Sequence, residues 1–228
     1  MLTGEIRDII RDSEKNGWVM EPEAKGILSL AGMDVPNFRW AKEVEEAEEY
    51  ALEIGYPVVA KIVSPEVVHK SEVGGVVVGI HDAAMLGRTF SRFQHLDGFS
   101  GMLVEEVMTG LELILGANID YQFGPVILLG IGGTGVEIYR DTSLRMAPLR
   151  KEDIKSMVNG LKAHRLLEGY RGNDPVDMEE LGRLMIMFSE LVMDIENDID
   201  SIDLNPVVCS SNRCVVADAR IMLKKENA

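Results

Sequence analysis

A polar loop between two apolar, strand-like runs is the feature that most constrains this chain. The runs are Val58–Val63 and Val76–Ile80, and residues 65–75 between them read P-E-V-V-H-K-S-E-V-G-G. The loop shows no periodic spacing of apolar residues, so packing alone does not account for it. Because loops held by rigid strands often carry functional side chains, His69 is a candidate functional residue. Taken alone, His69 is better explained as an exposed surface histidine.

The other elements do not alternate regularly between strand and helix. Apolar spacing, caps and glycine stops predict helices over residues 3–15, 21–31, 43–54, 82–93, 151–161 and 178–193. Strand composition predicts strands over residues 38–41, 102–107, 112–119, 126–129, 136–139, 144–147, 199–204 and 215–223. This order predicts an α+β protein with two lobes that meet near residues 107–110.

Charge and hydropathy exclude several classes of partner. The chain has 228 residues, of which 38 are acidic and 23 basic, giving a net charge of −15. Such a balance argues against a nucleic-acid groove or contact with an anionic membrane. No apolar run approaches the ~20 residues that span a bilayer, and the N-terminus lacks the pattern of a signal peptide. We therefore expect a cytoplasmic protein.

The two cysteines do not form a disulfide framework or a metal-ligand quartet. Cys209 and Cys214 flank the turn-like sequence S-S-N-R, so they can face each other in a hairpin. Two free thiols are the favoured expectation for a cytoplasmic protein.

A glycine-rich sequence, G-I-G-G-T-G at residues 130–135, has the spacing of a dinucleotide-binding fingerprint. That fingerprint requires a helix to begin within the motif, whereas V-E-I-Y-R-D follows here with the period of a strand. The segment is therefore interpreted as a glycine turn between strands, either a plain hairpin turn or a loop that approaches phosphate. No Walker A lysine follows, which excludes a standard P-loop.

Several charged residues lie in or beside strand-like runs. Lys61 interrupts an apolar strand; it either reaches the surface or points into a cleft, where a lysine can hold phosphate. Glu105 and Glu106 end a strand, and Glu112 follows; they form an exposed edge or bind adenine amino and ribose hydroxyl groups. Arg145 either neutralises a transferring phosphoryl group or forms a surface salt bridge.

The sequence D-L-N-P suggests a metal site near the C-terminus. Asp203 and Asn205 are two residues apart on a predicted strand, so they point to the same face. Asp218 lies in a second apolar run that is expected to pair with the first. Oxygen ligands of this kind suit Mg²⁺, which is usually held by one or two carboxylates and substrate phosphates. The alternative is a set of polar residues that flank turns.

Four segments carry, in order, a resemblance to a known family. They are G-Y-P-V-V-A-K-I, H-K-S-E-V-G-G-V, G-G-T-G-V-E-I-Y-R-D and I-D-L-N-P-V-V. The chain resembles the β subunits of ADP-forming acetyl-CoA (acyl-CoA) synthetases, which are ATP-grasp proteins related to the β subunit of succinyl-CoA synthetase. The resemblance implies an ATP-grasp fold with nucleotide between two α+β lobes. It assigns residues 1–20 to a helical extension, 21–107 to the lobe with the His69 loop and 108–228 to the lobe with the Mg²⁺ site.

The resemblance also implies roles for individual residues. The nucleotide would be contacted by Lys61, Glu105, Glu106, Val107 and Glu112. Mg²⁺ would be held by Asn205 and Asp218, with Asp203 as a third group. Arg145 would face the phosphates, and His69 would carry a phosphoryl group to ADP.

The implied reaction is acyl-CoA + ADP + phosphate = carboxylate + ATP + CoA. A separate CoA-binding α subunit would form the acyl phosphate and pass the phosphoryl group from its own histidine, within an α2β2 assembly. This chain has no convincing CoA site of its own. A stand-alone ATP-grasp ligase and a non-catalytic nucleotide-sensing module are the alternatives.

Overall fold

The computed structural model describes residues 4–133, 141–170, 172 and 174–224, which fall into two compact units. Unit 1 contains residues Met1–Val35 and Thr109–Ala228, and unit 2 contains Pro36–Met108. Both units combine helices with antiparallel sheet, which confirms the expected α+β class.

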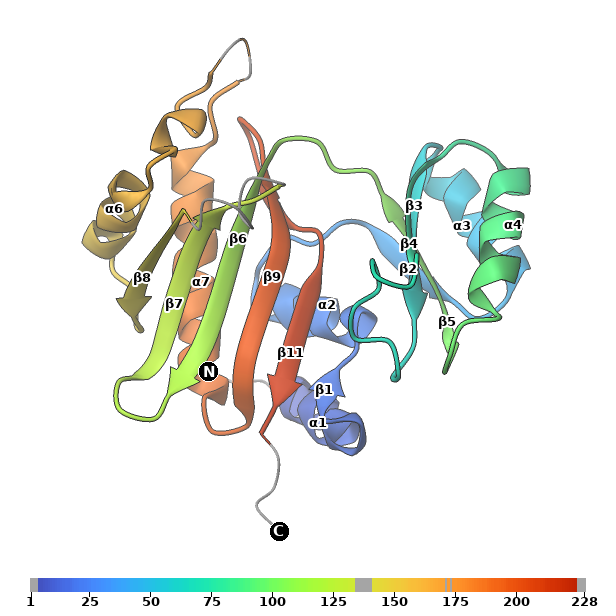
Figure 1. Ribbon diagram of the computed structural model, residues 1–228, viewed down its shortest axis with the longest axis horizontal. Helices are drawn as coiled ribbons and strands as arrows, with labels where there is room; N and C mark the ends of the chain where they lie inside the picture. Colours follow the sequence, from blue (N-terminus) through green and yellow to red (C-terminus); the bar gives the residue numbers. More distant parts are fainter. Residues whose placement is uncertain (1–3, 134–140, 171, 173, 225–228) are drawn as a thin grey trace. The chain divides into compact units, whose positions relative to one another are not determined.

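Unit 1 is built on an antiparallel sheet of seven strands among its described residues (Figure 1). The strand order is β1-β11-β9-β6-β7-β8, and β10 pairs with β9 off this path. The strands are β1 (Trp18–Val19), β6 (Leu111–Asp120), β7 (Gly124–Ile131), β8 (Thr142–Met146), β9 (Ile199–Cys209), β10 (Cys214–Val216) and β11 (Ala219–Leu223).

The helices of unit 1 cover one face of this sheet. Among the described residues these are α1 (Gly4–Ser13), α2 (Glu21–Leu30), α6 (Lys151–Gly160) and α7 (Met178–Ile195), with short 3-10 turns η1 (Glu14–Asn16) and η2 (His164–Leu166). Figure 1 shows α2 and α7 behind the strands, where their buried side chains join those of β6, β7 and β9 in one core. The other strand face carries polar side chains on β9.

Unit 2 has a four-stranded antiparallel sheet in the order β2-β5-β3-β4. Its strands are β2 (Phe38–Ala41), β3 (Val58–Val63), β4 (Val76–Ile80) and β5 (Gly101–Glu106), and its helices are α3 (Val44–Ile54) and α4 (Ala83–Phe93). The apolar stripes of both helices pack against this sheet and form a separate core. The central strand β3 is buried along its whole length, which explains its apolar sequence.

Local sequence signals account for several helix ends. The Asp82 carboxylate accepts a hydrogen bond from the Met85 amide at 2.7 Å, which confirms the predicted N-cap of α4. The helix α3 ends at Gly55, whose backbone is in the left-handed region at φ +86°. Only glycine adopts that conformation without strain, so the predicted glycine stop is also confirmed.

Two strand predictions need correction. β9 continues five residues beyond the predicted end and reaches Cys209, because both of its edges find partners in β6 and β10 or β11. The run predicted as one strand over residues 215–223 is divided into β10 and β11, and Asp218 lies in the break between them. The predicted strand over residues 136–139 lies outside the described residues.

The N-terminal segment belongs to a different unit from the one expected. The prediction placed residues 21–35 in the lobe that carries His69, whereas the structure places them in unit 1. Ala24, Ile27 and Leu28 of α2 are fully buried in the core of unit 1. β1 also pairs with β11, so the N-terminal residues complete the larger sheet. The second predicted boundary, between residues 107 and 108, lies one residue from the observed division.

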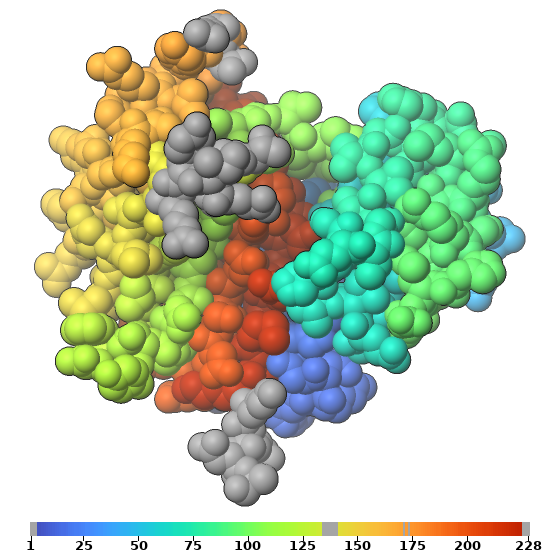
Figure 2. All heavy atoms as spheres, in the orientation of Figure 1, coloured from blue at the N-terminus to red at the C-terminus, as the bar shows by residue number. Residues whose placement is uncertain are grey.

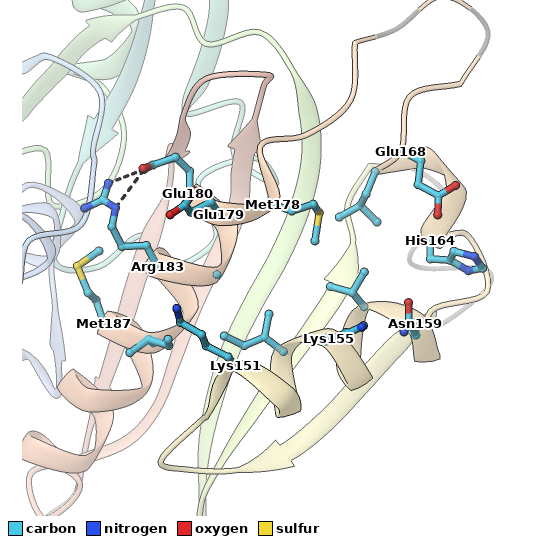
Figure 3. Close-up of a pocket in the computed structure, with 15 residues that line it drawn as sticks. Lys151, Lys155, Asn159, His164, Glu168, Met178, Glu179, Glu180, Arg183 and Met187 are labelled. Carbon is cyan, nitrogen blue, oxygen red and sulfur yellow. Dashed lines mark hydrogen bonds and ion pairs between the residues drawn. The ribbon is translucent and has the colours of Figure 1, made fainter.

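Unit 1 presents both a cavity and exposed apolar side chains. The outer faces of α6, η2 and α7 line a cavity of about 750 Å³ (Figure 3). The tip of the β6–β7 hairpin lies at the lower left of Figure 2 (lime). Its Tyr121 and Phe123 are 97% and 60% exposed. Among the described residues, no helix has both the length and the apolar character that a membrane span requires.

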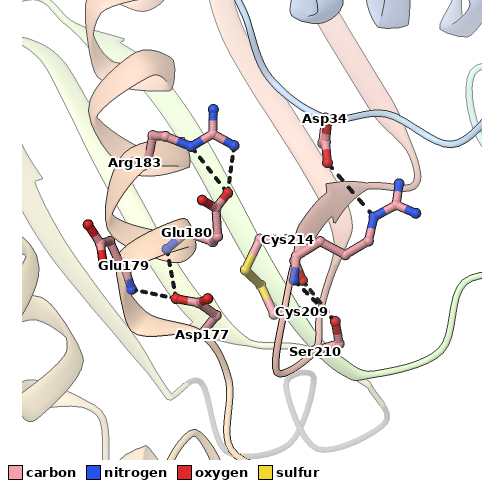
Figure 4. Close-up of polar contacts among 9 residues, drawn as sticks. Asp34, Asp177, Glu179, Glu180, Arg183, Cys209, Ser210 and Cys214 are labelled. Carbon is pink, nitrogen blue, oxygen red and sulfur yellow. Dashed lines mark hydrogen bonds and ion pairs between the residues drawn. A yellow bond between two sulfur atoms is a disulfide. The ribbon is translucent and has the colours of Figure 1, made fainter.

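The two cysteines form a disulfide, contrary to the expectation of free thiols. Cys209 and Cys214 are register partners across the β9–β10 hairpin and are linked to each other (Figure 4). The hairpin closes with a hydrogen bond from the Ser210 amide to the Arg213 carbonyl at 2.9 Å. Directly paired residues in an antiparallel ladder bring their Cβ atoms close together, which is the geometry that a disulfide needs.

Candidate functional site

The His69 loop in unit 2 is anchored at both ends and exposed at its centre. Val67 is buried in the core, and the Ser64 hydroxyl donates a hydrogen bond to the Asp97 carbonyl at 2.7 Å. On the other side, Arg92 of α4 donates to the Gly74 carbonyl at 2.8 Å. His69 itself is exposed. The loop therefore presents an imidazole to solvent from a fixed base.

A close backbone contact fixes where the loop returns to the sheet. The Gly75 amide donates to the Lys70 carbonyl at 2.7 Å, and the Gly75 carbonyl accepts from the Ile62 amide at 2.8 Å. A Cβ atom on Gly75 would lie 2.5 Å from Ile62 Cγ2 and 3.0 Å from the Lys70 carbonyl oxygen. Glycine is therefore required at this position for the observed turn.

Lys61 and Glu105 form a buried ion pair in the same unit. Lys61 Nζ of β3 lies 2.7 Å from Glu105 Oε1 of β5, and the two side chains are only 6% and 3% exposed. Lys61 therefore does not reach the surface, and the interpretation of Lys61 as a surface lysine is excluded. A lysine ammonium group is also a common phosphate ligand, so the pair is compatible with phosphate binding.

The other acidic residues predicted near the nucleotide are in different surroundings. Glu106 ends β5, and its Oε1 accepts a hydrogen bond from the Asn37 amide at 3.0 Å. Val107 follows the strand and is half-buried. Glu112 is the second residue of β6 in unit 1, where its carbonyl accepts a hydrogen bond from the Gly132 amide at 2.6 Å. Glu112 therefore supports the start of the glycine-rich turn.

Burial and nearby acids affect a tyrosine beside β5. Tyr50 of α3 is buried, and Arg39 of β2 lies over its ring at 4.4 Å. Burial raises the pKa of the Tyr50 phenol, and the Glu53 carboxylate adds to this increase. The phenol therefore stays protonated beyond the pH at which an exposed tyrosine ionises.

The structure brings two of the three predicted metal ligands together in unit 1. The Asn205 amide donates a hydrogen bond to the Asp218 carbonyl at 3.2 Å, so β9 and the β10–β11 break are adjacent here. Asp203 lies two residues before Asn205 on the same strand face, away from α2 and α7. Its carboxylate pairs with Arg220 of β11 at 3.2 Å. Asp203 is thus partly neutralised, whereas Asn205 and Asp218 are the better placed pair.

The chemistry of this pair suits a hard cation that keeps other ligands. An amide oxygen and a carboxylate are oxygen donors of the type that Mg²⁺ prefers. In the part of the chain that the structure describes, no group of three or more His, Cys, Asp or Glu side chains could hold a metal ion. Phosphate and water would therefore have to complete the coordination.

Arg145 is not brought together with the metal pair. It is opposite Ile127 in the β7–β8 ladder, and Ile127 is fully buried under the helices of unit 1. Arg145 therefore points to the helix-covered face, where it donates to the Ser156 hydroxyl of α6 at 2.6 Å. Asp203 and Asn205 point to the opposite face. Strand alternation thus directs the Arg145 side chain away from the face of Asp203 and Asn205, and its expected role at phosphate stays a prediction.

Arg220 is the cation that sequence analysis missed. It is opposite Asp203 in the β9–β11 ladder, so it shares the strand face of Asp203 and Asn205. The signal was present in V-A-D-A-R-I, where Arg220 follows Asp218 by two residues. The register of β9 and β11 was needed to recognise it.

Comparisons with known proteins agree on one type of domain. A family model described as an ATP-grasp domain matches residues 11–223. The β subunit of the ADP-forming acetate–CoA ligase I of Pyrococcus furiosus is 38% identical over 226 residues, covering 95% of this chain and 97% of that protein.

Solved structures give the same result. The dinucleotide-forming acetyl-coenzyme A synthetase 1 of Ca. Korarchaeum cryptofilum, in complex with coenzyme A, Ca-AMPCP and HgCl⁺, is similar with a TM-score of 0.89 and 40% identity, covering 96% of this chain and 99% of that one. A second structure of that synthetase, with coenzyme A and Mg-AMPPCP, has a TM-score of 0.84 and 39% identity, covering 96% of this chain and 100% of that one. In it, a phosphohistidine segment points towards the nucleotide-binding site.

Proposed function

This chain belongs to the ATP-grasp family, and on that premise we propose that it is the nucleotide-binding β subunit of an ADP-forming acyl-CoA ligase. The reaction is acyl-CoA + ADP + phosphate = carboxylate + ATP + CoA. The observation that carries the proposal is His69, an exposed imidazole at the centre of a loop with anchored ends. Two relatives that match 95% and 98% of this chain are named as β subunits of ADP-forming acetate–CoA ligases.

His69 is proposed to carry the phosphoryl group. A neutral imidazole nitrogen attacks the phosphorus of a phosphohistidine on the partner subunit, so that one N–P bond forms as the other breaks. The terminal phosphate oxygen of ADP then attacks the same phosphorus, which forms ATP and regenerates the imidazole. Exposure is necessary for both steps, because the histidine has to meet two different groups.

The remaining residues are proposed to position the nucleotide. Lys61, oriented by Glu105, donates hydrogen bonds to phosphate oxygens. Glu106, Val107 and Glu112 contribute polar and backbone groups near the base and ribose. Phosphoryl transfer depends mainly on such positioning and on charge neutralisation.

Mg²⁺ is proposed to be held by Asn205 and Asp218. When bound, the ion neutralises phosphate charge during transfer. The adjacent backbones of these two residues and the oxygen character of their side chains support this assignment. Asp203 and Arg220 are proposed to orient the site rather than to ligate the ion.

A CoA-binding α subunit is proposed to complete the enzyme. Relatives of the same length are named as β subunits, which implies a partner chain. We propose an α2β2 assembly, which light scattering of the purified complex would test through its mass; a complex of any other stoichiometry would contradict it.

The function is tested by replacing His69 in the reconstituted complex. We expect His69→Ala to retain nucleotide binding but to lose ATP formation from acyl-CoA, ADP and phosphate, because no group remains to carry the phosphoryl. His95→Ala is the matched control, since His95 is also an exposed histidine of unit 2. Full activity of His69→Ala, measured by coupled ATP detection, would exclude this role.

A further inference from the structure

The cavity of about 750 Å³ on the outer side of the helix layer in unit 1 has no role in the proposed reaction (Figure 3). Its walls come from α6, η2, α7 and the residues beside them. The α7 residues that line it, such as Gly182 and Ile186, lie opposite the face that buries Leu184 and Phe188. The cavity is thus separated by the helices from the strand face of Asp203. Its volume falls within the ~300–1,000 Å³ typical of small-molecule sites.

The floor of the cavity is apolar. It is formed mainly by Ile154, Val158, Leu167, Ile186 and Met187. Ile154, Val158 and Leu167 are buried members of the core of unit 1, whereas Ile186 and Met187 are only partly buried and supply most of the open apolar surface. A ligand with an apolar body would remove this surface from water, which is favourable in proportion to the area covered.

Two lysine ammonium groups without a countercharge among the described residues lie on one rim of the cavity. Lys151 and Lys155 are one helical turn apart on α6, so they share a face. Considering residues 4–133, 141–170, 172 and 174–224, neither ammonium group has a hydrogen-bond or ion-pair partner. The third cation of the lining, Arg183, is already engaged by Glu180, as Figure 3 shows.

The acidic and neutral groups are arranged elsewhere around the cavity. Figure 3 shows Glu168 beside His164, beyond the C-terminal end of α6. His164 Nδ1 lies 2.9 Å from the Leu161 carbonyl; because a carbonyl only accepts, Nδ1 is the donor in this contact. Glu179 lies on the opposite wall, in the first turn of α7. The lysine rim is therefore the positive part of the site.

A glycine keeps the α7 wall open. Gly182 lies inside an 18-residue helix, where glycine is less favourable than alanine. A Cβ atom built there meets nothing within 4 Å, so no neighbour in the described structure requires glycine. The missing side chain leaves space for a ligand directly against the helix backbone.

Hydrogen bonds hold the walls in place without a ligand. The buried Ser189 hydroxyl of α7 accepts from the Leu149 amide just before α6, at 2.7 Å. The Asp141 carboxylate accepts from the Lys162 and Ala163 amides at 2.7 and 2.8 Å, and thereby fixes the turn between α6 and η2. A preformed cavity binds a ligand without the cost of ordering its walls.

We propose that this cavity binds an amphipathic organic anion. Its apolar body contacts the floor around Val158 and Ile186, and its carboxylate or sulfonate accepts hydrogen bonds from Lys151 and Lys155. This inference does not rest on the proposed phosphoryl transfer, and it can fail or hold independently of it. The chain's net charge of −15 opposes anion binding in general, so local lysines are needed.

The probe for the test is 8-anilino-1-naphthalenesulfonate, an aromatic sulfonate whose fluorescence rises on binding; octanoate serves as a competing carboxylate. We expect one saturable site that octanoate displaces. Lys151→Gln with Lys155→Gln should weaken binding by about tenfold through loss of charge-assisted hydrogen bonds. Lys162→Gln is the matched control, because Lys162 is an exposed lysine near the same elements that does not line the cavity.

A second pair of variants tests the cavity itself. Gly182→Leu should fill it and abolish probe binding while the melting temperature stays the same or rises, because leucine favours helix and its Cβ atom meets no neighbour within 4 Å. Gly182→Ala should raise helix stability and keep the site. Unchanged binding in Gly182→Leu would overturn the proposal. Equal weakening by Lys162→Gln would also overturn it. Loss of probe binding on addition of the CoA-binding partner would reassign the cavity to a protein interface.

Discussion

Lys61 shows how a single residue can depart from its local sequence. A lysine in an apolar strand normally sends its ammonium group to the surface, but here it is buried against Glu105. Burying two paired charges of opposite sign costs far less free energy than burying either charge alone. The pair is therefore expected to be coupled in stability as well as in nucleotide binding.

The coupling predicts a specific pattern of unfolding energies. Lys61→Met should lower the free energy of unfolding by ~3 kcal/mol, because it leaves the Glu105 carboxylate buried without its cation. The double variant Lys61→Met with Glu105→Leu should be less destabilised than the single variant. Urea unfolding of both proteins measures the difference. Additive losses in the double variant would show that the two charges act independently.

Tyr50 gives a prediction about pH. Burial raises the pKa of its phenol in the folded state, with Glu53 contributing in the same direction. The Tyr50 phenol therefore stays protonated to a higher pH in the folded protein than in the unfolded chain, whose tyrosines ionise near pH ~10. The associated stability is present below that pH and declines as the pH rises further. The absorbance difference at alkaline pH between the native protein and Tyr50→Phe should show a late transition, and a transition at the unfolded value would contradict it.

Some residue positions follow from sequence, and others need the register of the sheet. The Asp82 cap depends only on residues within one turn, so it could be predicted. The direction of Arg145 depends on which face of β8 packs against α6, which only the pairing with β7 decides. Arg220 was missed for the same reason, because its partner Asp203 is 17 residues away.

At the level of elements, the His69 loop depends on how it rejoins β4. Gly75 packs so closely on Ile62 that no side chain fits without a shift. Gly26 of α2 is the opposite case, because a Cβ atom there meets nothing within 4 Å. The two glycines therefore form a natural contrast between a required glycine and a replaceable one.

Alanine substitutions test this contrast. Gly75→Ala should destabilise the protein by ~1–3 kcal/mol, since the added methyl group overpacks the turn. Gly26→Ala should instead stabilise it by up to ~1 kcal/mol through helix propensity. Thermal unfolding of both variants is the measurement. If Gly75→Ala were as stable as the native protein, the close packing of Gly75 against Ile62 would be contradicted.

Element types were largely predictable, but their ends and partners were not. The helices follow apolar periodicity and caps, and α3, α4 and α6 agree closely with expectation. β9 was predicted too short because residues 205–209 contain a proline and turn-like neighbours. The disulfide was missed because the cytoplasmic expectation outweighed the hairpin that places Cys209 opposite Cys214.

At the scale of the whole molecule, the division of the chain reflects long-range pairing. Residues 1–35 complete the sheet and core of unit 1 although more than 70 residues separate them from its next strand, β6. No local pattern marks that return, so the boundary at residue 21 could not be predicted correctly. The resemblance of the four sequence segments to known β subunits was sufficient for the family, since it does not depend on local packing.

The central claim is that His69 carries the phosphoryl group between the partner subunit and the nucleotide. Phosphoryl transfer is reversible, so Mg²⁺ and ATP labelled at the γ-phosphate should label this chain in the reconstituted complex. We predict an acid-labile, alkali-stable label on the peptide that contains His69, absent in His69→Ala and retained in His95→Ala. Nucleotide binding without any label on this chain, or a label that persists in His69→Ala, would contradict the account.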